Sequence, residues 1–167
     1  MSAPDLPAPD LSAAASAVDL ARDVVQRGLA HVAATGSVDA DQVVAYDLAH
    51  AAAAVETART LLDYGAKGDE EARITVAFAA EAVADVAAKL YGREAAWGVD
   101  AAALDGARTV VAAYRDPAFL ASIDGPGPRH LDDDFEMVQD AFRRFAEDKI
   151  RPVAEHIHRH NADIPEE

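Results

Sequence analysis

Apolar residues recur every three or four positions through most of the chain, which is the spacing that places side chains on one face of an α-helix. The first such segment begins at a potential cap, Asp10 or Ser12, and ends near Thr35, where Gly36 stops it. Gly28 lies inside this helix, where it lowers helix propensity but lets a neighbouring element approach closely. The predicted inner face consists of Val18, Ala21, Val25, Leu29 and Val32.

Two further helices are predicted between residues 39 and 90. One starts at Asp39, with Gln42 in the position of a capping box, and stops at Gly65. Its apolar residues follow the alternating steps of a coiled coil: Val44, Leu48, Ala51, Val55, Ala58 and Leu62. The next helix covers about 69–90, and its apolar residues spread over more than one face. We therefore expect it to be central, with neighbours on two sides.

The fourth predicted helix starts at Asp100 and ends before Pro117, and one more turn is expected around 119–123. No segment alternates β-branched and polar residues as a half-buried strand does. Short connections between helices favour antiparallel neighbours. The sequence thus predicts an all-α fold, an antiparallel helical bundle.

The last segment, 132–167, is predicted to form one long kinked helix. Carboxylates at 132–134 suit a helix N-terminus, and Pro152 predicts a kink just before it. One face carries apolar residues at steps of three to five positions, which we call the apolar stripe: Phe135, Val138, Phe142, Phe145, Ile150, Val153 and Ile157.

These patterns divide the chain into four parts. Residues 1–9 contain three prolines and little to bury, so a disordered tail is expected. Residues 10–124 form the helical domain, and 125–131 form a linker that begins with Gly-Pro-Gly-Pro. The final helix follows at 132–167.

Composition narrows the classes of function. The chain has 167 residues, 51% of them hydrophobic, and many of these are alanines, so the core should be thin and closely spaced. A formal net charge of −15 disfavours binding to nucleic acids and anionic membranes. The absence of cysteine excludes disulfides and thiolate chemistry. Neither a signal peptide nor a membrane-spanning run is present, so we expect a cytoplasmic protein.

The histidines near the C-terminus are the strongest candidate for a metal site. His156 and His160 lie four residues apart and share a helix face. Zinc needs further ligands, and His158 points elsewhere on a helix. Glu155 and Asp163 complete the cluster. We favour solvated histidines that the negative end of the helix stabilises.

The other polar candidates have simpler interpretations. The triplet at 132–134 lacks the spacing of a calcium loop and is interpreted as a helix cap. Trp97 and Tyr114 are potential pocket residues, although a single tryptophan in a small helical domain more often anchors the core. No residue is assigned a catalytic, cofactor-binding or metal-binding role. Three polar residues of the second helix are interpreted as exposed: Asp47, His50 and Glu56.

The run RRFAEDKIRPVAEHIHRHNADIPEE resembles the first helix of the acyl-CoA dehydrogenase family. That helix carries Arg-x-Phe-Ala, then Pro-Val-Ala, a charged segment and a second proline. Here the corresponding residues are Arg144, Phe145, Ala146, Pro152, Val153, Ala154 and Pro165. Residues 1–125 resemble the helical N-terminal extension of the subgroup typified by (2S)-methylsuccinyl-CoA dehydrogenase.

The resemblance implies that the chain is the N-terminal portion of a flavoenzyme. Such enzymes oxidise an acyl-CoA thioester to its α,β-enoyl form, with a glutamate as base and FAD as hydride acceptor. The catalytic and FAD-binding parts of the family would lie beyond Glu167, so this segment is expected to be structural and to bind no FAD alone. The ending Ile-Pro-Glu-Glu has the form of a new helix N-terminus, so we expect a truncated sequence.

The partners implied are the remainder of the enzyme, its acyl-CoA substrate and further copies in a homo-oligomer. Downstream helices would cover the apolar stripe. The residues alone also support an alternative, a free-standing acidic helical module that binds a partner protein through its last helix.

Overall fold

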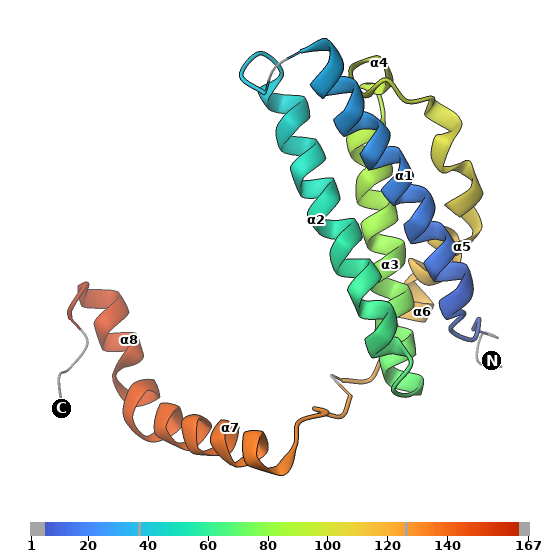
Figure 1. The fold of residues 1–167 in the computed structure, drawn as a ribbon. Coiled ribbons are helices and arrows are strands. Elements are labelled where there is room, and N and C mark those ends of the chain that lie inside the picture. Colours follow the sequence, from blue (N-terminus) through green and yellow to red (C-terminus); the bar gives the residue numbers. More distant parts are fainter. Residues whose placement is uncertain (1–5, 37, 126, 164–167) are drawn as a thin grey trace. The chain divides into compact units, whose positions relative to one another are not determined.

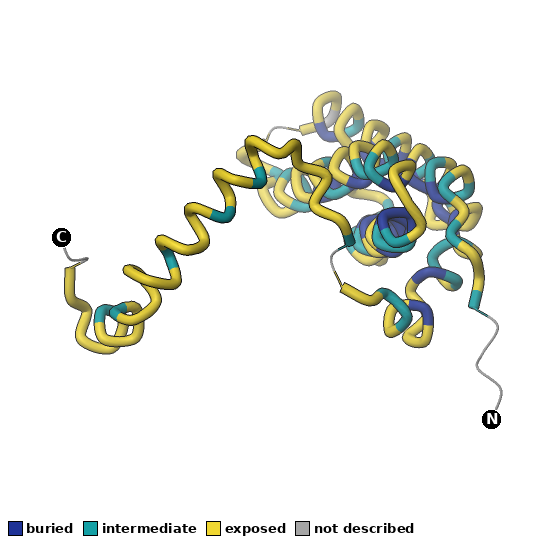
Figure 2. Tube along the Cα trace, turned by 90° about the horizontal axis from the view of Figure 1, so that it is seen from below, coloured by how far each residue is buried: buried dark blue, intermediate teal, exposed yellow. Residues whose placement is uncertain are grey.

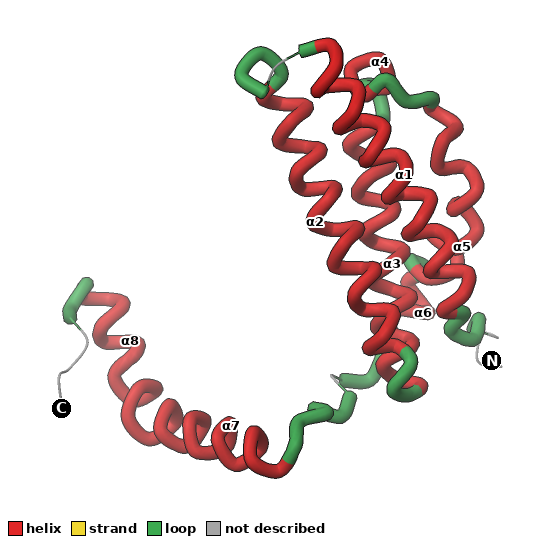
Figure 3. The backbone as a smooth tube through the Cα atoms, in the orientation of Figure 1, coloured by secondary structure: helices red, strands yellow, loops and turns green. Residues whose placement is uncertain are grey.

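The computed structural model describes residues 6–36, 38–125 and 127–163, and in these ranges it contains helices and no strand (Figures 1 and 3). The all-α prediction is confirmed. The chain divides into two compact units, residues 1–127 and 128–167. None of the helices in the described ranges is both long and apolar enough to cross a membrane.

The first helix, α1 (Leu11–Thr35), has the predicted limits. The Asp10 carboxylate accepts a hydrogen bond from the Ala13 amide at 2.9 Å, which satisfies one of the unpaired donors of the first turn. At the other end the Gly36 amide donates to the Val32 carbonyl at 3.1 Å.

The second helix, α2 (Gln42–Gly65), starts later than predicted. Asp41 is its N-cap, so Gln42 is the first helical residue and the predicted capping box with Asp39 is wrong. The Asp41 carboxylate lies against Gly36, where an added Cβ atom would clash with Oδ2 of Asp41. Residues 39–41, which were expected to begin the helix, therefore lie in the turn that brings Asp41 back to α1.

The central position expected for the third helix is confirmed by α3 (Asp69–Leu90), which packs against α2, α1 and α5. Figure 2 shows the buried residues running along the packed helices of this unit. Contact on more than one side explains why the apolar residues of α3 do not form a single stripe.

The segment after α3 is more broken than the predicted fourth helix. It contains the short α4 (Glu94–Trp97), which the sequence did not predict, and then a 3₁₀ helix, η1 (Ala101–Ala107), with Asp100 as its cap. Gly106 lowers the α-helical propensity of this stretch. The α-helical part is limited to α5 (Arg108–Tyr114), and the expected extra turn is α6 (Pro117–Ala121).

The core of this first unit consists mainly of alanine and valine, with a few large side chains at key positions. Trp97, Phe119 and Leu48 are the largest fully buried residues. A Cβ atom on Gly28 would lie 2.7 Å from Cδ2 of Leu48 and 3.1 Å from Cε3 of Trp97. Gly28 thus permits the close approach that the sequence predicted, between α1, α2 and α4.

The predicted tail and linker have contacts of their own where the structure describes them. Residues 1–5 of the predicted disordered tail lie outside the described ranges. The next residues differ from that expectation, because the Tyr114 hydroxyl donates to the Ala8 carbonyl and accepts from the Asp10 amide. Near the linker, the Asp124 amide donates to Glu70 at 2.9 Å.

The second unit contains α7 (Asp133–Phe145), a π-helical turn η2 (Ala146–Ile150) and α8 (Arg151–His160). The kink predicted before Pro152 falls at this π turn. Proline lacks an amide donor and crowds the carbonyl four residues earlier, so the wider turn accommodates it. Asn161, in the left-handed conformation, ends α8, and residues 164–167 of the predicted helix lie outside the described ranges.

Candidate functional site

The apolar stripe is the main candidate surface of the second unit. Phe142 is 70% exposed, Phe135 62% and Phe145 56%, while Val153 and Ile157 are half-buried. No residue of α7, η2 or α8 is buried. Burying a large apolar side chain contributes about 1.5–3 kcal/mol, so a partner that covered this face would gain substantial binding energy.

The π turn keeps the stripe in phase. Phe145 and Ile150 are five residues apart, which would place them on different faces of a regular α-helix. The Arg151 amide donates to the Ala146 carbonyl, five residues back, which is the hydrogen bond of a π turn. One extra residue is thereby absorbed, so Ile150, Val153 and Ile157 continue the face that begins at Phe135.

The charged side chains of this helix form ion pairs with one another, one turn apart. Arg151 pairs with Glu147 at 2.6 Å and Arg159 with Glu155 at 2.8 Å. These side chains are largely exposed, so each pair contributes little to stability.

The C-terminal histidines lie as their spacing predicts. The rings of His156 and His160 stack with centroids 4.4 Å apart, and Nδ1 of His160 lies 3.0 Å from the His156 carbonyl oxygen. Across the described part of the chain, no group of three or more histidine, cysteine, aspartate or glutamate residues is placed to hold a metal ion.

The acidic triplet acts as a cap. The Asp132 carboxylate accepts a hydrogen bond from the Phe135 amide at 2.9 Å, and Asp133 and Asp134 lie in the first turn of α7. Carboxylates at these positions are stabilised by the positive end of the helix dipole.

The two aromatic candidates are core residues. Trp97 is fully buried, and within the described ranges its Nε1 is the one buried side-chain polar atom without a hydrogen-bond partner. Tyr114 is also buried, its ring is 5.0 Å from that of Phe119, and its hydroxyl contacts residues 8 and 10.

The three polar residues of α2 differ in their surroundings. His50 is exposed beside Tyr46, and Glu56 is exposed between two arginines. Hydrogen bonds from Arg59 and Arg22 lower the pKa of Glu56. Asp47 is an exception to the predicted exposure, because its side chain is only 14% exposed and pairs with Arg93.

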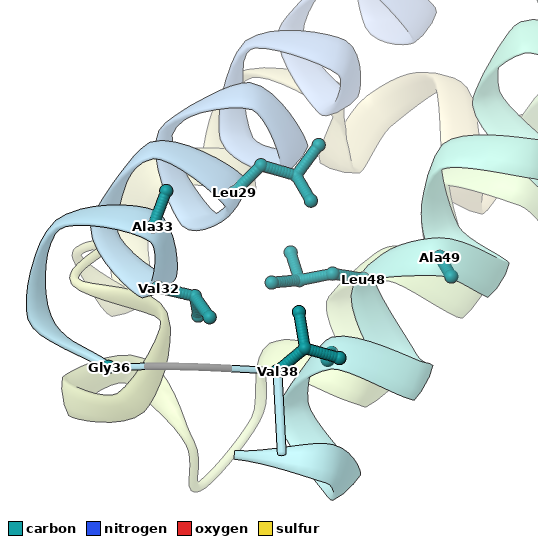
Figure 4. Close-up of a pocket in the computed structure, with 8 residues that line it drawn as sticks. Leu29, Val32, Ala33, Gly36, Val38, Leu48 and Ala49 are labelled. Atoms are coloured by element: carbon teal, nitrogen blue, oxygen red, sulfur yellow. The ribbon is translucent and has the colours of Figure 1, made fainter. Parts of the chain in front are cut away.

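An apolar hollow that the sequence did not predict lies where α1 ends and α2 begins (Figure 4). Its volume is about 520 Å³. In Figure 4 the side chains of Val32, Val38 and Leu48 point toward one another across it. Among the described residues, the wall of the hollow contains no charged side chain and consists of Leu29, Val32, Ala33, Gly36, Val38, Ala45, Leu48 and Ala49.

A second hollow, of about 470 Å³, lies between α3, η1 and α5. Arg108 and Arg115 are in its wall, but the first pairs with Asp105 at 2.5 Å and the second with Glu81 at 3.0 Å. Because both cations have anionic partners, this hollow does not present a positive site for an anion.

Comparison with known proteins gives no relative: no family model, no curated protein and no solved structure matches the chain. The resemblance to acyl-CoA dehydrogenases therefore stays a prediction. Of the features described, the apolar stripe is the one whose chemistry points to a binding role.

Proposed function

We propose that the chain is a structural segment of an FAD-dependent acyl-CoA dehydrogenase, with residues 1–127 as an accessory helical unit and α7–α8 as an assembly element. The sequence resemblance at residues 144–165 supports this assignment, and the uncovered apolar stripe on the same helix carries the assembly role. The catalytic glutamate and the FAD site would belong to the remainder of that enzyme. The acyl-CoA substrate would bind there also.

The DNA after codon 167 provides the first test. Under this proposal it continues in frame into sequence of the acyl-CoA dehydrogenase family, and the longer protein binds FAD and oxidises an acyl-CoA, with methylsuccinyl-CoA as the first compound to assay. The 167-residue chain serves as the matched control and should show no flavin absorbance after incubation with FAD. Stoichiometric flavin on this chain, or a stop codon with no family sequence downstream, would contradict the proposal.

A second candidate function is a free-standing acidic helical module that binds another protein through α7–α8. The observation that favours it is the separation of charge along this helix, with acidic residues first and basic residues later. This is the arrangement expected of a helix that selects the orientation of its partner.

A further inference from the structure

Charge is unevenly distributed along the helix that carries the apolar stripe. Residues 132–142 contain five carboxylates and no basic residue. Residues 143–160 contain five arginines or lysines against three carboxylates, together with three histidines. The helix therefore has an acidic beginning and a basic end, and the apolar stripe runs along both parts.

This distribution makes the helix complementary to itself in one orientation. In a parallel pair the acidic triplets at 132–134 of two copies would lie together and repel. In an antiparallel pair each acidic beginning lies beside the basic end of the other copy, and the helix dipoles also oppose. We propose that α7–α8 forms an antiparallel homodimer with α7–α8 of a second copy of this chain, with the apolar stripe at its centre.

The spacing of the stripe fixes the register of that pair. Phe145 is the fourth of the seven stripe residues and therefore lies at the two-fold axis. Phe135 then packs near Ile157 of the second copy, and Val138 near its Val153. The π turn lies at the centre of the interface, where it keeps both halves of the stripe on the same face.

The residues beside the stripe fit this register. Ala141, Ala146 and Ala154 flank it with small side chains, which allow two helices to approach closely. Ala146 lies next to the two-fold axis and would face Ala146 of the second copy. Asp134 would lie beside His156 of the second copy.

This inference deepens the second candidate function, since it identifies the partner of α7–α8 as a second copy of this chain. It depends on the stripe and the charges and not on the flavoenzyme assignment, under which downstream helices would cover the stripe. The two can fail separately: the coding sequence downstream and FAD binding test the enzyme, whereas the mass of the 167-residue chain tests the dimer.

The first experiment measures that mass by sedimentation equilibrium. We expect a dimer for the natural chain, and for Phe142→Ser with Phe145→Ser a dissociation constant at least about a hundredfold higher, because truncated aromatic side chains at the centre of an interface remove most of its binding energy. The matched control is Tyr46→Ser with Tyr91→Ser, which removes two exposed aromatic residues from the first unit and should leave the dimer unchanged. A monomeric natural chain would overturn the proposal and assign the stripe to another segment or protein.

The second experiment determines orientation and does not depend on a disruptive variant. The chain has no cysteine, so single cysteines can be placed at chosen sites and joined with a short bismaleimide. Ala146→Cys should cross-link to itself, whereas Gln139→Cys should not cross-link to itself but should join Ala154→Cys when the two proteins are mixed. Self-linking of Gln139→Cys would show a parallel pair and overturn the proposed orientation.

The third experiment exchanges charges. Asp134→Arg should weaken the dimer because it places a cation beside the basic end of the other copy, and adding His156→Glu should restore it at least tenfold by giving that arginine an anionic neighbour. If the second substitution weakens the dimer further, Asp134 and His156 are not neighbours across the interface and the register is wrong.

Discussion

Single residues determine how closely the helices of the first unit pack. Alanine and valine give a thin core, and Gly28 allows Trp97 and Leu48 to lie directly on the backbone of α1. The indole of Trp97 is enclosed on all sides, so it has little room to move away from an added atom.

Gly28→Ala should therefore destabilise the unit, although alanine favours helices. Overpacking a dense core costs about 1–3 kcal/mol, while the gain in helix propensity is about 1 kcal/mol. We expect the free energy of unfolding in urea, followed by Trp97 fluorescence, to fall by up to about 2 kcal/mol. Gly106→Ala is the control, because its Cβ would meet only Cδ2 of Leu20 at 3.3 Å, and it should leave stability unchanged or higher. Equal effects at both glycines would contradict this account of Gly28.

The ion pairs of Glu56 predict a dependence on pH. Arg59 and Arg22 hold the pKa of Glu56 below its usual value of 4.5. A carboxyl whose pKa is lower in the folded chain stabilises it above the unfolded pKa, and this contribution is lost as the pH falls through the folded value. The natural chain should therefore melt at a higher temperature than Glu56→Gln at pH 7. The difference should shrink as the pH falls below 4.5 and should disappear once the pH is below the lowered pKa of Glu56. High salt should reduce the difference at pH 7, since Glu56 is exposed. A difference that grows in acid would contradict the assigned cause.

At the scale of elements, the helices whose ends are marked by capping residues and glycines were predicted well. The limits of α1 and the central place of α3 followed from Asp10, Gly36 and the distribution of apolar residues. The start of α2 was not predictable, because Asp41 contacts Gly36 of the preceding turn, a contact that no local pattern encodes. The helix α4 has only four residues, too few to show a period, and Trp97 within it is held by tertiary packing.

The candidate surface was predicted in its residues but not in its geometry. The sequence gives the seven positions of the apolar stripe and a kink before Pro152. A proline alone does not indicate that the wider turn precedes it at Ala146–Ile150, or that this turn corrects the five-residue step between Phe145 and Ile150. The apolar hollow between α1 and α2 was missed because it is formed by residues from two helices and their connection.

The π turn supports a prediction for this helix. Removing Asp148 together with Pro152→Ala should convert the π turn to regular α-helix. The apolar stripe should stay continuous, because the deletion removes the one extra residue that the π turn contains. The variant should keep the sedimentation behaviour of the natural chain. Removing Asp140 instead changes the step from Val138 to Phe142 and rotates the two halves of the stripe by about 100°. That deletion should abolish any self-association, and a dimer that survives it would show that the phase of the stripe is unimportant.

For the whole molecule, the buried residues and the exposed apolar stripe belong to different units. Every buried residue of the described ranges lies between residues 14 and 119, and α7, η2 and α8 contribute none. The formal charge of −15 is also divided between the units. Residues 1–127 contain 19 carboxylates and 9 basic residues, a net charge of −10, and residues 128–167 contain 11 carboxylates and 6 basic residues, a net charge of −5. The stability of the first unit thus depends on its own core.

A chain that ends at Gly127 should therefore unfold at nearly the same temperature as the full chain. Trp97 is the only tryptophan of the sequence and lies in the first unit, so its fluorescence follows the unfolding of that unit alone. We expect the two midpoints to agree within about 2 °C, because 1 kcal/mol shifts the midpoint of a domain of this size by several degrees. A chain that ends at Asp116 is the control: it lacks the buried Phe119 and should melt far lower, since removing a buried phenylalanine side chain costs about 3–5 kcal/mol. If instead the chain ending at Gly127 melts more than about 5 °C below the full chain, the apolar stripe contributes to the stability of the first unit, and the assembly role proposed for α7–α8 would be wrong.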